Sequence, residues 1–330
     1  MSARSARSKA NWPPWRRATL ASFPRYWAGA PKIAGVNVPI VVDSSTQLSE
    51  YLAGQLDFIP VPLGDYQRIS GDAALSKQLL VYTRAQVLFL GLNPRVYPPF
   101  ADVRVRRAFA MAIDKAKISQ TVFFGFFTPA GSIVPPGIPG FYQGFKGLPY
   151  DPAGAKRLLD EAGASGKLPT LQIAMNPFGP VAQMEAEPVA AMLRQNLGVD
   201  VQIQRTEFSN FISNLNKRTV YQAFMTGWSA DYLDYSDYLD VLLYSKSPIN
   251  RVNYASAVFD KLVDQANAAA NETQRIAIYH QAEALAVNDA PMIPMLFPHF
   301  AYLKKPYVQG LLTSPAVSGW LPFSGVRIVR

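Results

Sequence analysis

A dense group of aromatic and acidic side chains lies between residues 228 and 240. The stretch reads WSADYLDYSDYLD and contains one tryptophan, three tyrosines and four aspartates. Aromatic rings beside carboxylates suit a ligand that joins an apolar or ring face to a cationic or hydroxyl end. The stretch follows a predicted strand, and ligands of α/β sheets tend to bind at the carboxyl ends of strands. The residue types alone fit a surface loop better, with the aspartates as helix caps and turn formers.

Two enzymatic or metal-binding interpretations of the same aspartates are weaker. A glycosidase would use two of the carboxylates, such as Asp231 and Asp234, as acid and as nucleophile or base, but the sequence does not give the separation that this chemistry requires. A calcium loop of the EF-hand type is not predicted, because the stretch lacks the glycine turn and the terminal glutamate.

The rest of the sequence offers few groups for catalysis. It has no cysteine, which removes thiol nucleophiles, thiolate zinc sites and iron–sulfur clusters. It has two histidines, and we expect His280 to be partly exposed on a helix and His299 to be a hydrogen-bonded structural residue. No GxSxG, P-loop or GxGxxG motif is present. We therefore expect a protein that is not an enzyme and needs no cofactor.

The elements that must position the 228–240 stretch follow from hydrophobic periodicity and from turn residues. Strands are predicted at 36–42, 79–83, 86–92, 171–175, 199–203, 220–228 and 295–303. Helices are predicted at 46–55, 102–121, 152–162, 182–196, 208–216, 259–270 and 273–288. A long loop rich in glycine and proline is predicted at 125–147. The strand, helix and strand between 171 and 203 form a β-α-β unit, so the fold class is α/β.

Charge argues against a nucleic-acid-binding face. The formal net charge is +9, but seven basic residues and no acid occur between residues 1 and 32. The remainder is nearly neutral, so a surface that binds polyanions is not expected. No apolar run is long enough to predict a transmembrane helix. The basic start is interrupted by prolines and arginines, and it gives no recognisable signal peptide and no cysteine for lipid attachment.

Several segments in order resemble the family 5 solute-binding proteins of bacterial ABC importers, the class that includes oligopeptide-, dipeptide- and nickel-binding members. The matching segments are PRYWAGAPKIAGV at 24–36, DSSTQLSEYLAGQLDF at 43–58, DVRVRRAFAMAIDKAKI at 102–118, PAGSIVPPGIPG at 129–140, YDPAGAKRLLDEAG at 150–163, GWSADYLD at 227–234, RVNYASAVFDKLVDQA at 251–266 and RIAIYHQAEALAVNDAPMIPML at 275–296. The resemblance is nearly continuous from residue 24 onward. Its specificity comes from the order and spacing of the segments.

The resemblance implies a two-lobed α/β fold like that of periplasmic binding proteins (type II, class C-like), which closes around a ligand at a hinge. Residues 1–23 are expected to be a basic tail, 24–97 part of the first lobe, 98–296 the second lobe, and 297–330 a return segment that packs on the first lobe. The chain is shorter than full members of the family, so we expect a truncated N-terminal part and an incomplete first lobe.

The resemblance also assigns binding residues. Asp231 matches the aspartate that pairs with the α-amino group of the ligand in peptide-binding members, and Trp228 matches a neighbouring pocket residue. Tyr232 and Asn253 are weaker candidates for ligand contact. The expected function is a receptor that delivers oligopeptide-like ligands to the permease subunits of an ABC transporter, on the periplasmic or extracellular face of the membrane.

Besides the weaker glycosidase interpretation, three alternatives remain open at this point. An oligosaccharide could stack on Trp228 and the tyrosines and donate hydroxyl hydrogen bonds to the aspartates. A nickel or haem ligand would find little direct coordination, with two histidines and no cysteine. A truncated remnant without binding activity is the third.

Overall fold

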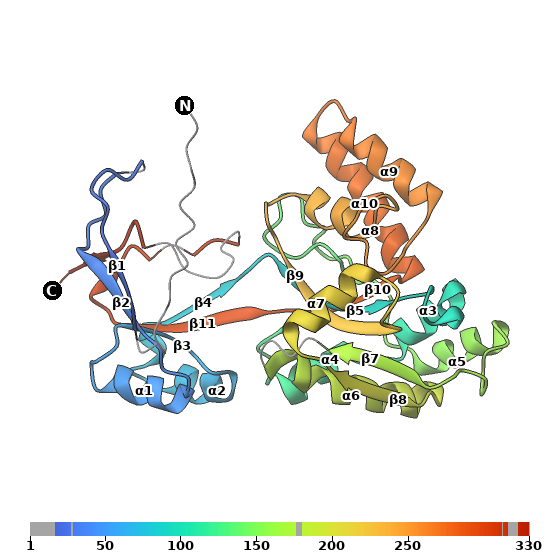
Figure 1. The fold of residues 1–330 in the computed structure, drawn as a ribbon, viewed down its shortest axis with the longest axis horizontal. Coiled ribbons are helices and arrows are strands. Elements are labelled where there is room, and N and C mark those ends of the chain that lie inside the picture. The colour runs from blue at the N-terminus through green and yellow to red at the C-terminus, as the bar shows by residue number, and fades with distance from the viewer. Residues whose placement is uncertain (1–16, 28, 176–179, 312, 316–322, 330) are drawn as a thin grey trace. The chain divides into compact units, whose positions relative to one another are not determined.

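The structure is a computed structural model that describes residues 17–27, 29–175, 180–311, 313–315 and 323–329, without the side chains of residues 180–183. The chain divides into two compact units (Figure 1). Unit 1 consists of residues 1–81, 301–313 and 319–330, and unit 2 consists of residues 82–300 and 314–318. Each unit is described separately below.

Unit 1 consists of small sheets and short helices. Its helices are α1 (Ser44–Leu52), α2 (Leu63–Gly71) and the 3-10 helix η1 (Ser76–Gln78). An antiparallel pair is formed by β1 (Arg17–Ala21) and β2 (Gly35–Pro39). A three-stranded sheet has the order β3 (Phe58–Pro60), β11 (His299–Lys304) and β4 (Leu79–Thr83), and a further pair joins β12 (Val308–Gln309) to β13 (Arg327–Ile328).

A small core of its own stabilises unit 1. It contains apolar side chains of α1, α2, β3 and β11 and of the residue before η1: Leu48, Tyr51, Ile59, Ile69, Leu75 and Leu303. Asp43 caps α1, because its carboxylate accepts a hydrogen bond from the Thr46 amide at 2.7 Å.

Unit 2 is built on a six-stranded mixed sheet. The strand order is β6 (Thr128–Pro129), β10 (Met292–Phe297), β5 (Gln86–Leu92), β9 (Ala223–Ser229), β7 (Leu171–Met175) and β8 (Val201–Arg205). β7 pairs in parallel with β8, which confirms the predicted β-α-β unit. β5 lies inside the sheet and pairs antiparallel with both β9 and β10.

Helices cover the sheet of unit 2. They are α3 (Val103–Met111), α4 (Lys115–Val122), α5 (Pro152–Glu161), α6 (Pro180–Leu197), α7 (Phe208–Lys217), α8 (Leu239–Leu243), α9 (Ala257–Asn267) and α10 (Glu272–Asp289), with the 3-10 helices η2 (Pro98–Ala101) and η3 (Tyr235–Asp237). α6 contacts β7, β8 and β9, and α9 packs on α10. Within the described residues, no helix is both long and apolar enough to cross a membrane.

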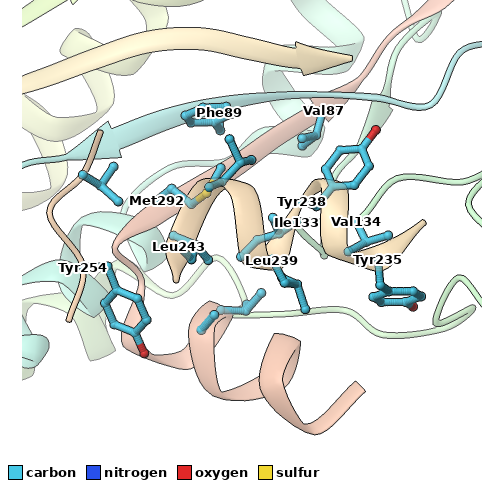
Figure 2. Packing of buried hydrophobic residues seen from close by; sticks show 14 of the residues in the cluster. Val87, Phe89, Ile133, Val134, Tyr235, Tyr238, Leu239, Leu243, Tyr254 and Met292 are labelled. Carbon is cyan, nitrogen blue, oxygen red and sulfur yellow. The ribbon is translucent and has the colours of Figure 1, made fainter. Parts of the chain in front are cut away.

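The core of unit 2 joins its sheet to the segment that carries the candidate site. Val87 and Phe89 of β5 belong to the same core as Tyr238 and Leu239, which lie near the end of the 228–240 stretch (Figure 2). Alternate residues of a strand face the same side, so the spacing of Val87 and Phe89 places both in this core. The loop that follows β9 is therefore attached to buried side chains of the hydrophobic core.

One predicted helix is wrong. The pattern at 102–121 predicted a single helix, but the structure has α3 and α4 separated at residues 112–114. The physical reason is Asp114, whose carboxylate accepts a hydrogen bond from the Lys117 amide at 2.8 Å and so caps a new helix start.

The units differ in their boundaries from the lobes predicted at 97/98 and 296/297. The unit boundaries lie at 81/82 and 300/301. The difference arises because β5 pairs with β9 and β10, which places residues 86–92 in the sheet of unit 2. Residues 17–21, predicted as part of a tail, form β1, and residues 1–16 and 316–322 lie outside the described part. The assignment of lobes therefore stays a prediction.

Candidate functional site

The aspartate-rich loop, residues 230–240, begins where β9 ends and is anchored just before the start of β5. Trp228 lies opposite Val87 in the antiparallel register of the two strands. The Ala230 amide donates to the Ala85 carbonyl at 2.8 Å, and the Tyr238 hydroxyl donates to the same carbonyl at 2.6 Å. Tyr238 is fully buried, so this anchor is shielded from water. Both ends of the loop are thus fixed to one backbone position.

Asp231 presents its carboxylate at the surface of this loop. The residue is exposed, and within the described part of the chain its side chain accepts no hydrogen bond and forms no ion pair. Tyr232 beside it is 48% exposed, and its phenol oxygen accepts a hydrogen bond from the Ser236 hydroxyl at 3.2 Å. Trp228 is half-buried. These three candidate residues therefore offer one free carboxylate and two aromatic rings that are at least partly exposed.

Asp237 is buried and bonds to two of these three residues. Only 1% of the residue is exposed. One carboxylate oxygen, Oδ2, accepts hydrogen bonds from the Trp228 indole at 3.2 Å and from the Asp231 amide at 3.0 Å. Burial raises the pKa of Asp237, although the two hydrogen bonds act in the opposite direction. The other oxygen, Oδ1, is buried and has no hydrogen-bond partner among the described residues.

The other two aspartates of the loop, Asp234 and Asp240, accept hydrogen bonds from other side chains of the protein. Asp234 forms an ion pair with Arg275 of α10, with N–O distances of 2.5 and 2.6 Å, and caps η3 by accepting from the Ser236 amide. Burial acts to raise the pKa of Asp234, but the hydrogen bonds from Arg275 and Ser236 outweigh it and lower the pKa to about 2. Asp240 accepts from Asn267 at 2.7 Å. Asp234 therefore does not offer the second free carboxylate that the glycosidase interpretation requires.

Asn253 does not join the other candidate residues. Its amide nitrogen donates to Asn93 Oδ1 at 2.9 Å and to the Arg218 carbonyl at 3.0 Å. Asn93 follows the end of β5, whereas Ala85, which anchors the Asp231 loop, precedes its start. A strand of this length separates the two places by about 20 Å. Asn253 therefore joins two loops at one end of β5, whereas Asp231 lies near the other end of that strand.

The two histidines lie where the sequence predicted them. His280 is partly exposed on α10, and its Nε2 lies 2.8 Å from the Gly140 carbonyl. His299 has both ring nitrogens bonded, Nδ1 with the Thr83 hydroxyl at 2.7 Å and Nε2 with the Thr128 hydroxyl at 2.8 Å. No cluster of three histidine, aspartate or glutamate side chains suited to a metal ion occurs in the part of the chain that the structure describes.

Sequence reasoning missed the role of Asp237. The residue stood within the aspartate-rich stretch, but nothing in its spacing distinguished it from Asp234 or Asp240. Its partners are an indole nine residues earlier and an amide six residues earlier, and neither separation is a local motif. Asp237 differs from its neighbours because it is buried within the 3-10 helix η3, and burial depends on the surrounding tertiary structure.

Comparison with known proteins gives the chain a family context. Residues 9–250 match the family described as bacterial extracellular solute-binding proteins, family 5 Middle. The chain is 30% identical over 319 residues to the probable di/tripeptide-binding protein 5 of Pseudomonas aeruginosa (strain UCBPP-PA14), which covers 94% of this chain and 58% of that protein. It is also 30% identical to haem-binding protein A of Haemophilus influenzae (strain ATCC 51907 / DSM 11121 / KW20 / Rd), covering 92% of this chain and 55% of that protein.

Solved structures agree with this fold. The murein tripeptide-binding protein of Escherichia coli superposes with a TM-score of 0.79 at 26% identity, over 96% of this chain and 62% of that one. The two-lobed α/β fold predicted from the sequence is therefore confirmed as the fold of its structural relatives. The chain spans somewhat more than half the length of the curated relatives that it matches.

Proposed function

Because the chain belongs to the bacterial extracellular solute-binding proteins of family 5, we propose that it is a receptor that captures peptides for an ABC importer. The α-amino group of the peptide would bind at Asp231. The observation that carries this proposal is the distribution of roles among the four aspartates of the loop. Within the described residues, Asp231 alone of the four has an exposed carboxylate with no protein partner, and in the chain it stands between the aromatic residues Trp228 and Tyr232.

The chemistry of a peptide terminus fits this arrangement. An ammonium group that leaves water needs an anionic acceptor, since an unpaired buried charge is strongly unfavourable. The Asp231 carboxylate would supply that acceptor without first having to break an internal contact. The two rings would cover the apolar part of the first residue, and water could fill the space around varied side chains. Removing one partner of a desolvated charge pair costs about 2–5 kcal/mol.

The same proposal implies partners and a location. The ligand would be an oligopeptide, and the permease subunits of an ABC transporter would receive it at the periplasmic or extracellular face of a membrane. Capture would use closure of two lobes, a shift between states that ligand binding favours. The chain passes from one unit to the other within β4 and β11, so these strands are where we expect the hinge.

The experiment that tests the proposal is native mass spectrometry of the purified chain with a pool of di- to pentapeptides, followed by calorimetric titration with a captured peptide. We expect Asp231→Asn to weaken binding by about 30-fold or more, as loss of a desolvated charge partner does. Asp200→Asn is the matched control, because Asp200 is also an exposed aspartate but precedes the edge strand β8, which β7 separates from β9.

Acetylation of the peptide supplies a second arm. If Asp231 pairs with the α-amino group, the wild type should bind the acetylated peptide as weakly as Asp231→Asn binds the free one. The Asp231→Asn variant should barely distinguish the two peptides. Equal affinity of wild type and Asp231→Asn for the free peptide would overturn the assignment. Capture of oligosaccharides in place of peptides would overturn the ligand class.

A further inference from the structure

Asp237 connects the two groups that the proposed site needs, although it lies too deep to touch a ligand. The residue is 1% exposed. Its Oδ2 accepts from the Trp228 indole, which belongs to β9, and from the Asp231 amide, which belongs to the loop after β9. One buried oxygen atom thus fixes the orientation of a ring and the path of the backbone that carries the free carboxylate.

We propose that Asp237 is the positioning residue of this peptide site, which it builds by holding the Trp228 ring and the Asp231 backbone in one geometry. The inference rests on the proposed function, because it assigns a role within the same site. Residues 230–234 form neither helix nor strand, so no ladder of backbone hydrogen bonds fixes them. The Ala230 anchor holds the start of the loop, and the Asp237 oxygen holds its next residue.

The charged surroundings of Asp237 indicate that its position needs a hydrogen-bond acceptor and does not need a negative charge. Asp231 and Asp234 are the neighbouring carboxylates, and both disfavour a further negative charge at Asp237. The Arg275 guanidinium is paired with Asp234 by two hydrogen bonds, and Asp237 has no ion pair among the described residues. An uncharged side chain with an oxygen in the same place should therefore serve equally well.

The test compares Asp237→Asn with Asp237→Ala in the whole chain, titrated with a free and an acetylated captured peptide. An asparagine oxygen can accept from both the indole and the amide, so we expect the Asp237→Asn variant to bind within about threefold of the wild type. Alanine removes the acceptor of two hydrogen bonds, and we expect about 10-fold weaker binding or more. The Asp237→Ala variant should also lose most of the preference for the free α-amino group.

Folding is checked by circular dichroism and thermal melting of each variant. A folded Asp237→Ala variant that binds within about twofold of the wild type would overturn the positioning role, and so would a folded Asp237→Asn variant as weak as Asp231→Asn. If Asp237→Ala does not fold, the peptide affinity of Asp237→Asn by itself tests the positioning role. Failure of the proposed function has a different signature, because then the wild type itself would bind no peptide.

Discussion

Four aspartates spaced three residues apart have four different surroundings in this protein. Asp231 is exposed without a protein partner among the described residues, whereas Asp234 pairs with Arg275. Asp237 is buried beneath Trp228, and Asp240 accepts from Asn267 of α9. Identical side chains thus differ in exposure, hydrogen bonding and role because of what packs around each one. Mutational effects should separate in the same way.

At the residue scale, Asp234→Asn should lower stability without removing the Asp231 carboxylate. Hydrogen bonds from Arg275 and Ser236, opposed by burial, lower the folded-state pKa of Asp234 to about 2. A lowered carboxyl pKa adds stability above the unfolded value, and that stability is lost as the pH falls from about 4 to 2. We expect the variant to lose about 1–2 kcal/mol of unfolding free energy at pH 7 and almost nothing near pH 2.

Urea denaturation at pH 7 and near pH 2 measures this difference. Asp200→Asn is again the control, because its ion pair with Arg194 is long, at 3.8 Å, and exposed. That variant should change stability by less than about 0.5 kcal/mol at pH 7. An Asp234→Asn variant as stable as the wild type at pH 7 would contradict the importance of the Arg275 pair.

At the element scale, the loop predicted at 125–147 is fixed to α10 by a buried carboxylate. Glu283 is fully buried, and its Oε1 accepts from the amides of Ile133 and Val134 at 3.0 and 2.8 Å. The Tyr235 hydroxyl also donates to the Gly140 carbonyl at 3.0 Å. The length and composition of this segment predicted a loop, and its described contacts attach it to the same core that supports η3 and α8.

Glu283 should make stability fall as the pH rises. Burial raises its folded-state pKa to about 7 from an ordinary value of 4.5, so the folded protein retains a proton that the unfolded chain releases. The contribution of Glu283 to stability is then constant below about pH 4.5, declines between about 4.5 and 7, and is constant again above. Glu283→Gln keeps the acceptor oxygen without the charge. At pH 8 we expect it to exceed the wild type by about 1–3 kcal/mol, and to match it at pH 4.5.

Urea denaturation from pH 4.5 to 8 tests this expectation. Glu187→Gln is the control, because Glu187 is exposed on α6 and should leave the pH dependence unchanged. Burial also raises the pKa of Glu185 to about 8, so some decline with pH should persist in Glu283→Gln. Identical pH slopes for Glu283→Gln and the wild type would show that Glu283 does not hold the proton.

At the scale of the whole molecule, each unit has a hydrophobic core of its own. The core of unit 1 is centred on residues such as Ile69, which is fully buried in α2, and the core of unit 2 includes Tyr238 and Phe259. Separate cores predict separate cooperative unfolding, because few of the stabilising contacts of one core depend on the other.

Differential scanning calorimetry of the whole chain should therefore resolve two transitions. Ile69→Ala removes a buried aliphatic side chain and should destabilise the transition of unit 1 by about 2–5 kcal/mol. Asp234→Asn should shift the other transition, because Asp234 and Arg275 both belong to unit 2. A single transition that both substitutions shift would show instead that the units unfold as one cooperative body.

The sequence by itself determined the fold class, the family and the elements with strong local patterns. β4, β5 and β7 begin and end where hydrophobic patterning predicted, since each is a short run rich in apolar residues. The β-α-β unit followed from the hydrophobic pattern, which changes from the period of a strand to that of a helix and back again. The sequence also placed Trp228 at the end of a strand and Asp231 and Tyr232 just after it, and the structure has them there.

Only the tertiary structure decided which polar groups remain free. The strand order that puts β5 between β10 and β9, and separates Asn253 from Asp231, depends on pairing between segments far apart in the chain. The division of four similar aspartates into one exposed carboxylate and three internal acceptors depends on burial and on partners such as Arg275 and Trp228. Local sequence encodes backbone preference, whereas burial and long-range partners arise from packing, and they decide which carboxylate can meet a ligand.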